Sequence, residues 1–110
     1  MQGSRGRAFR ANVRLDVDGS AVVVSGEIDA HTAAHLEDAI EHAAEAASTV
    51  DLDLSQVSFM GSSGLRALLA ARQRGDRRIV LVDPSPVVVS LLQATELDSL
   101  FPVRRRPTGG

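Results

Sequence analysis

From Asp51 to Leu65 the chain carries the sequence DLDLSQVSFMGSSGL. Apolar residues at every second position of 50–54 predict a strand with one buried face. Residues 55–60 are expected to form the connection to a helix that opens on two serines, Ser62 and Ser63. The first N–H groups of a helix lack partners and lie at the positive end of its dipole, so a phosphoryl group is well tolerated there. The segment therefore predicts a strand followed by a helix with a hydroxyl site at its start.

The rest of the chain predicts further strands and helices in alternation. Apolar periodicity and turn residues divide it into strands at 9–16 and 21–25, a helix at 32–47, the strand at 50–54, a helix at 63–74, a strand at 77–82, a helix with Ser85 as N-cap and Pro86 at its first position, and a closing segment at 97–103. Asp18-Gly19 is a hairpin turn signal, and Gly75-Asp76 is expected to end the second helix. Strands that alternate with helices pair in parallel. The predicted fold class is α/β, with helices on a mixed four-stranded sheet in the order β-β-α-β-α-β-α.

The apolar patterns also predict which strand residues are buried. Three consecutive valines at 22–24 are consistent with a strand covered on both faces. In the connection after the third strand, Val57, Phe59 and Met60 are expected to turn inward. The first helix is predicted to pack through residues three or four apart: Ala33, Leu36, Ile40, Ala43 and Ala47.

Polar residues before the first helix have two interpretations. Asp29 and Thr32 both carry side-chain oxygens suited to the N-cap of that helix. Glu27 and Asp29 flank Ile28 in a predicted loop, where they either form the turn or contact a partner. Residues and spacing alone leave both interpretations open.

Composition indicates one domain of modest size. The 110 residues include no cysteine, three aromatic residues that are all Phe, and twelve basic residues that are all Arg, and the formal net charge is −2. The absence of lysine excludes Schiff-base chemistry, and the slightly acidic balance argues against direct nucleic-acid binding. Residues 1–8 and 104–110 are expected to be flexible ends of a single domain at 9–103. Without a signal-like start or an apolar run of about 20 residues, a cytoplasmic protein without a membrane segment is expected.

The serine pair has two alternatives to a functional site. One serine can simply cap the helix and satisfy its first N–H groups. A hydrolase nucleophile is disfavoured, because Gly61-Ser-Ser-Gly64 is one residue short of the G-x-S-x-G elbow. The three histidines, which could supply a base, all lie near or on the first predicted helix: His31, His35 and His42. A functional hydroxyl is therefore one that a partner modifies or contacts, and no catalytic residue is predicted.

Three other polar groups favour ordinary structural roles. His31 and His35 are four residues apart but lack a clear third ligand, so no metal site and no cofactor are predicted. Asp51 and Asp53 share the outward face of their strand, where paired carboxylates could serve acid–base chemistry but more simply face solvent. A basic cluster is predicted along and after the second helix, where a solvated face is the simplest interpretation: Arg66, Arg72, Arg74, Arg77 and Arg78.

Four stretches together resemble the STAS domain family, specifically the bacterial anti-sigma factor antagonists. The strongest is the motif at 53–65, and the others are GEIDAHT at 26–32, LVDPSP at 81–86 and ELDSLFP at 96–102. They occur in the family's order, and the resemblance spans about Phe9 to Val103. It implies a non-enzymatic regulator of transcription that works by exchanging protein partners in the bacterial cytoplasm.

The resemblance also implies specific partners and site residues. Members of the family bind an anti-sigma factor that is also a serine kinase, a GHKL-type ATPase, and thereby free a sigma factor. The kinase phosphorylates one serine, which by position is Ser62 (second choice Ser63), and a PP2C-type phosphatase resets the switch. Asp29 falls on a position that resembles a kinase-contacting acid. The expected partner-binding set is Asp29, Gly61, Ser62, Ser63, Gly64 and Arg66.

The sequence departs from the family pattern at two places. The residue before the serine pair is commonly Asp, and here it is Gly61; the segment 65–79 is about one helical turn shorter than usual. The missing carboxylate keeps a second hypothesis open, a STAS binding module of a transporter or signalling scaffold that is not phosphorylated. A third hypothesis, a small hydrolase or metalloenzyme, lacks the base and the ligands it needs.

Overall fold

The structure is a computed structural model that describes residues 13–18, 21–45, 47–74 and 77–107, with side chains from residue 21 onward. Its elements in chain order are β1 (Val13–Asp18), β2 (Ala21–Ile28), α1 (Ala33–Ala44), β3 (Thr49–Met60), α2 (Ser62–Gln73), β4 (Arg78–Val82), α3 (Pro86–Ala94), a 3-10 turn (Asp98–Leu100) and β5 (Val103–Arg104). Parts of the sequence prediction fall outside these residues: the first strand's start at Phe9, Gly19 of the hairpin turn and the Gly75-Asp76 helix end.

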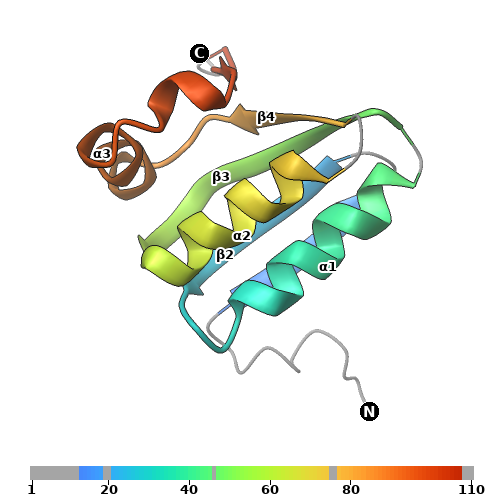
Figure 1. The fold of residues 1–110 in the computed structure, drawn as a ribbon, viewed down its shortest axis with the longest axis horizontal. Coiled ribbons are helices and arrows are strands. Elements are labelled where there is room, and N and C mark those ends of the chain that lie inside the picture. Colours follow the sequence, from blue (N-terminus) through green and yellow to red (C-terminus); the bar gives the residue numbers. More distant parts are fainter. Residues whose placement is uncertain (1–12, 19–20, 46, 75–76, 108–110) are drawn as a thin grey trace.

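The strands form one mixed sheet in the order β1-β2-β3-β4-β5. β1 pairs antiparallel with β2, and every other neighbouring pair is parallel, so the predicted mixed α/β fold is confirmed. The two-residue β5 adds a fifth strand that the sequence pattern did not indicate. Figure 1 shows α1 and α2 side by side across one face of the sheet, and α3 beyond the end of β4.

The core lies between the sheet and the two helices that cover it. Val50, Leu52 and Leu54 of β3 are fully buried, as their alternation predicts. Leu36 and Ile40 of α1 meet them from the helical layer and are also fully buried. Burial of each such aliphatic side chain contributes about 1.5–3 kcal/mol relative to exposure.

The valines of β2 show that only one face of the sheet is covered by α1 and α2. Val22 and Val24 are fully buried, whereas Val23 between them is 37% exposed. The prediction that all three valines lie on a strand covered on both faces is therefore wrong. Side chains of a strand with one covered face point alternately into the core and out to solvent, and the outward residue here, Val23, is apolar.

β3 is much longer than the sequence indicated. It runs from Thr49 to Met60, so the residues expected to form a connection at 55–60 continue the strand. Likewise β2 continues to Ile28, which places Glu27 in the strand rather than in a loop. The extended strands reach the same edge of the sheet, where Ile28 and Met60 are register partners.

Two register shifts interrupt the pairing of β2 with β3. Residues 23 and 25 of β2 face residues 53 and 56 of β3, and residues 26 and 27 face residues 57 and 59. At the first shift, Asp53 Oδ1 accepts hydrogen bonds from the Ser55 amide and hydroxyl at 2.9 and 2.7 Å. At the second, Ser58 Oγ donates to the Gly26 carbonyl at 3.3 Å, and Gly26 has a φ of 99°, which favours glycine. β3 thus carries one extra residue at each shift, as in a β-bulge.

The second shift determines which residues near the end of β3 are buried. Regular alternation places Val57 and Phe59 on the same face. With the extra residue between them, Val57 and Met60 are buried and Phe59 is exposed. The prediction that Phe59 turns inward is wrong because the strand does not keep a period of two.

The start of α1 is held by a hydrogen-bonded turn. The helix runs from Ala33 to Ala44, shorter at its end than predicted, so Ala47 lies outside it. Thr32 occupies the N-cap position, but its side chain makes no capping bond to the helix. Asp29 instead organises the turn before it, so both candidate residues act at this helix start.

The C-terminal segment pairs with the sheet and with its outer carboxylates. Residues 103 and 104 form β5 beside β4, so the boundary expected at residue 103 falls inside a strand. Arg104 pairs with Asp51 at 2.6 Å and Arg105 with Asp83 at 3.3 Å, while Arg106 pairs with Asp53. The predicted outward placement of Asp51 and Asp53 is confirmed, and both are engaged in ion pairs.

The predicted arginine cluster divides into residues with different partners. Arg74 pairs with Glu37 and Glu41 of α1, and Arg77 makes two hydrogen bonds to Glu41 at 2.7 and 3.0 Å. These contacts join the end of α2 and the start of β4 to α1. The side chain of Arg72 donates to the Leu100 carbonyl at 2.9 Å, so most of the cluster has structural contacts.

Candidate functional site

The carboxyl ends of β2 and β3 meet the start of α2 at one edge of the sheet. Ile28 and Met60 form the last register pair, and the Gly61 amide donates to the Ile28 carbonyl at 3.1 Å. The turn at Asp29 therefore lies beside the turn into α2. Carboxyl ends of parallel strands are the usual place for a binding site in such sheets. We name this region, residues 27–29 and 58–66, the serine edge.

The serine pair lies in the first turn of α2, without acting as its cap. Gly61 is the N-cap, with φ −94° and ψ −172°, and the helix begins at Ser62. Ser62 is exposed and Ser63 is half-buried, and neither hydroxyl bonds to another residue in the described part of the chain. The interpretation of a serine as a plain N-cap is therefore wrong, since Gly61 holds that position and the hydroxyls remain unbonded.

Gly64 allows α2 to pack closely on the ends of β2 and β3. A Cβ atom at this position would lie 2.7 Å from Met60 Cγ and 2.9 Å from Ile28 Cγ2. Both neighbours are buried core side chains with little room to move. Gly64 is itself buried, and the absence of a side chain lets α2 lie close to the two strands, while its contact with a partner stays a prediction.

Asp29 is largely occupied by the turn between β2 and α1. Its Oδ1 accepts hydrogen bonds from the amides of His31 at 2.9 Å and Thr32 at 3.2 Å, and its own amide donates to Thr32 Oγ1 at 2.9 Å. Desolvation raises the pKa of Asp29, but the hydrogen bonds from His31 and Thr32 outweigh it, and the pKa lies below its ordinary value. The Asp29 carboxylate of the serine edge therefore stays ionised at neutral pH.

Two charged side chains of the serine edge form no ion pair with any residue that the structure describes. Arg66 lies one helical turn after Ser62, so the two residues share a helix face. Arg66 and Glu27 are both exposed, and neither side chain makes an ion pair within the described residues. The region thus presents a hydroxyl, a cation and a carboxylate that make no side-chain bond within the described residues.

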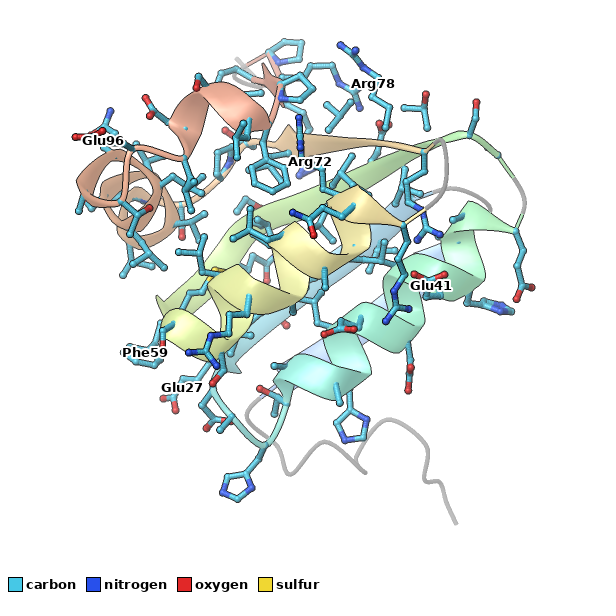
Figure 2. All side chains as sticks on the ribbon, viewed as in Figure 1. Glu27, Glu41, Phe59, Arg72, Arg78 and Glu96 are labelled. Atoms are coloured by element: carbon cyan, nitrogen blue, oxygen red, sulfur yellow. The ribbon has the colours of Figure 1, made fainter. Side chains whose placement is uncertain are left out.

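Phe59 is a residue of this region that the sequence analysis misplaced. Phe59 is 48% exposed, and it is the cross-strand register partner of Glu27. Figure 2 shows Phe59 and Glu27 projecting outward together at the end of the molecule where α2 begins. The glycine inside β2, Gly26, was the available signal, since a glycine within a strand often marks a bulge.

The histidines do not join this region as a metal site. His31 is exposed in the turn before α1, and His35 and His42 lie on the exposed side of the helix. The described residues contain no group of three or more His, Asp or Glu side chains that could hold a metal ion. None of their helices combines the length and the apolar character needed to cross a bilayer.

The fold and the serine edge define a small α/β domain with an exposed serine in the first turn of a helix. The sequence profile of the STAS domain matches residues 10–108. The chain therefore belongs to the STAS domain family, as its four motifs indicated.

Within this family, the chain is similar to proteins named as anti-sigma factor antagonists. The chain is 32% identical over 94 residues to the anti-sigma-B factor antagonist of Listeria monocytogenes, covering 81% of this chain and 82% of that protein. A crystal structure of an anti-sigma factor antagonist from Mycobacterium paratuberculosis matches with a TM-score of 0.68 and 33% identity, covering 88% of this chain and 86% of that one.

A third relative has been solved in two chemical states. The structure of the phosphorylated Bacillus cell fate determinant SpoIIAA has a TM-score of 0.62 and 25% identity, covering 86% of this chain and 91% of that one. The unphosphorylated form of the anti-sigma factor antagonist SpoIIAA has a TM-score of 0.65 and 26% identity, covering 86% and 88%. The homologues of the chain are therefore anti-sigma factor antagonists, in agreement with the resemblance seen in the sequence.

Proposed function

We propose that this protein is an anti-sigma factor antagonist switched by phosphorylation of Ser62. The unmodified form binds an anti-sigma factor that is also a GHKL-type serine kinase, and binding frees a sigma factor. The observation that carries the proposal is the exposed Ser62 hydroxyl in the first turn of α2, which bonds to no other residue in the part of the chain that the structure describes. The names of the relatives supply the class of partner, and SpoIIAA is a relative with a phosphorylated form.

The proposed modification transfers the γ-phosphoryl group of ATP to Ser62 Oγ. The hydroxyl loses its proton, the new P–O bond forms and ADP leaves. A PP2C-type phosphatase reverses the switch by hydrolysing the ester with water, which returns the hydroxyl and inorganic phosphate. The protein itself supplies no catalytic group in either step, so it acts as a substrate and binding partner rather than an enzyme in the cytoplasm.

The position of Ser62 explains how one phosphate can break binding without unfolding the domain. A phosphoserine carries roughly −1.5 to −2 charges at neutral pH. In the free protein, the first N–H groups of α2 and its dipole stabilise that charge by about 0.3–1 kcal/mol. In a complex the phosphate must lose its water, and a penalty of ~2–3 kcal/mol weakens binding by roughly 30- to 150-fold.

Phosphorylation can be mapped directly. The protein is incubated with its cognate kinase and ATP, and the modified residue is identified by mass spectrometry. We expect incorporation at Ser62, none in Ser62→Ala, and normal incorporation in Ser63→Ala. Persistent modification of Ser62→Ala at Ser63 would transfer the role to the second serine of the pair.

A second candidate function follows from Gly61. The family commonly has Asp before the serine pair, and a STAS binding module of a transporter or signalling scaffold need not be phosphorylated. A Cβ at Gly61 would lie 3.4 and 3.5 Å from Phe59 ring carbons, so the structure has room for a side chain there. If Gly61→Asp becomes a kinase substrate while the natural protein does not, the second candidate is favoured.

A further inference from the structure

Phe59 is an aromatic side chain at the surface beside the proposed modification site. It is 48% exposed, whereas Phe101, the other described Phe, is almost fully buried. The remaining large apolar side chains exposed in the described part of the chain are Val23 and Val103, both smaller. Single exposed apolar residues are common on proteins, so exposure alone does not indicate function. The surroundings of Phe59 provide the stronger argument.

The exposure of Phe59 results from a specific backbone arrangement. Without the second register shift, the residue would follow Val57 onto the covered face of the sheet. At this shift, Gly26 has a positive φ and its carbonyl accepts a hydrogen bond from Ser58 Oγ. Bulges of this kind are frequent next to functional sites, where they redirect a side chain.

The neighbours of the ring leave it uncovered. Gly61 lies against it without a side chain, although a Cβ atom there would make ordinary contact with the ring at 3.4 and 3.5 Å. The φ of Gly61 is −94°, which any residue adopts, so the backbone does not require glycine. Across the strand pair lies Glu27, which is exposed and has no ion-pair partner among the described residues.

We propose that Phe59 and Glu27 form the main docking contact for the anti-sigma factor of the proposed function. Phe59 would insert into an apolar socket of that partner, and Glu27 would pair with a Lys or Arg beside the socket. Aromatic residues dominate binding energies at interfaces when they fill a desolvated pocket. The inference rests on the proposed function and adds the chemistry by which the partner is recognised.

Charge favours this partner over a second copy of the same chain. A two-fold symmetric contact centred on Phe59 would bring together the two copies of its register partner Glu27. Like charges at an interface suppress association, whereas a basic partner surface is complementary to them. The closeness of Gly61 to the ring also places Ser62 at the rim of the contact, where a phosphate would have to be desolvated.

The test measures the affinity of the unmodified protein for the kinase that modifies it, with ADP bound to the kinase. We expect Phe59→Ala to weaken binding about 10- to 100-fold and Phe59→Leu to weaken it less. Val103→Ala is the matched control, because Val103 is also 48% exposed but lies in β5, and it should bind within about 2-fold of the natural protein. Equal thermal unfolding of the variants confirms that each is folded.

The charged half of the contact has its own test. Glu27→Lys should slow association, and the loss should shrink as the salt concentration rises. Glu96→Lys, an exposed charge reversal after α3, is the control that should leave binding unchanged. If the natural protein binds the kinase, and Phe59→Ala and Glu27→Lys bind it with the same affinity, this inference is wrong while the proposed function is unaffected. Natural protein that does not bind the kinase would overturn the proposed function, and the inference with it.

Discussion

The serine edge and the C-terminal arginine segment use the same kinds of side chain in opposite ways. At residues 104–106, three arginines are paired with Asp51 and Asp53 of β3 and with Asp83, which directly follows β4. At the serine edge, Arg66, Glu27 and the Ser62 hydroxyl have no partner within the described residues. A polar group that is already satisfied stabilises the fold, whereas an unsatisfied exposed group is free to bind another molecule. This contrast supports the choice of the serine edge as the proposed site, which sequence composition alone does not distinguish from other charged stretches.

The largest expected effect comes from phosphate at Ser62. Genetically encoded phosphoserine at position 62 should lower the affinity for the anti-sigma factor by roughly 30- to 150-fold, because the charge must be desolvated in the complex. Phosphoserine at Ser90, an exposed position on α3, is the matched control. Calorimetric titration measures both. Equal losses at the two positions would remove the distinction between the serine edge and the rest of the surface.

The next effect concerns the packing that positions α2. Gly64→Ala introduces a Cβ against Met60 and Ile28, and overpacking of about 1–3 kcal/mol outweighs a gain in helix propensity of up to about 1 kcal/mol. We expect a net loss of roughly 1–2 kcal/mol in the free energy of unfolding, measured with urea. Gly61→Asp is the control: its Cβ fits, and Asp is a good N-cap, so the change should stay within about 0.5 kcal/mol. A neutral Gly64→Ala would contradict the packing role.

A comparable effect on stability is expected at the ion pairs of Glu41. Two hydrogen bonds from Arg77 have the largest effect on the Glu41 carboxyl and lower its pKa from the ordinary value of 4.5. Desolvation opposes them, and the contact with Arg74 lowers the pKa further. The group is more acidic in the folded state, so its stabilisation is present above pH 4.5 and is lost as the pH falls through the folded pKa. Glu41→Gln should cost about 1–2 kcal/mol at neutral pH and reduce the loss of stability in acid. Asp38 lies on the same helix and has no ion-pair partner in the described residues. Asp38→Asn should therefore leave the free energy of unfolding at neutral pH and its decrease in acid as they are in the natural protein.

The smallest effect is expected in the arginine segment. Exposed ion pairs contribute little to stability, so Arg104→Ala with Arg106→Ala should lower the urea midpoint of unfolding only slightly, and less than Gly64→Ala does. Added salt should reduce the difference further, because these charges are close to solvent. Binding of the anti-sigma factor should not change. A substantial loss of binding in this double variant would show that the segment also contacts the partner.

Local patterns were sufficient to predict the elements that carry the proposed switch. The alternation at 50–54, the helix after Ser62 and the cap at Ser85 with Pro86 all depend on residues close together in sequence. The exposure of Phe59 could not be predicted in this way. This exposure goes with a hydrogen bond from Ser58 to Gly26, which lies 32 residues earlier, and with a register shift between β2 and β3. The shift changes which residues of β3 point outward.

The arginines show the same limit. Arg74 and Arg77 looked like part of a solvated basic cluster, but their partners Glu37 and Glu41 lie on α1, more than thirty residues away. A two-residue strand such as β5 has no periodicity to detect and forms only because β4 offers an edge. Contacts that form only when distant segments come together were therefore not predicted. In the sequence, Arg66 looks like Arg72, Arg74 and Arg77, and only the structure shows that those three have partners.

The central claim is tested most directly by sigma factor release in the presence of the kinase and ATP. The protein is added to the complex of the anti-sigma factor with its sigma factor, and free sigma factor is followed over time. Release by the natural protein should decay as Ser62 is modified, whereas release by Ser62→Ala should persist. Decay at the same rate in Ser62→Ala would contradict the account, because the loss of binding would then not depend on that hydroxyl.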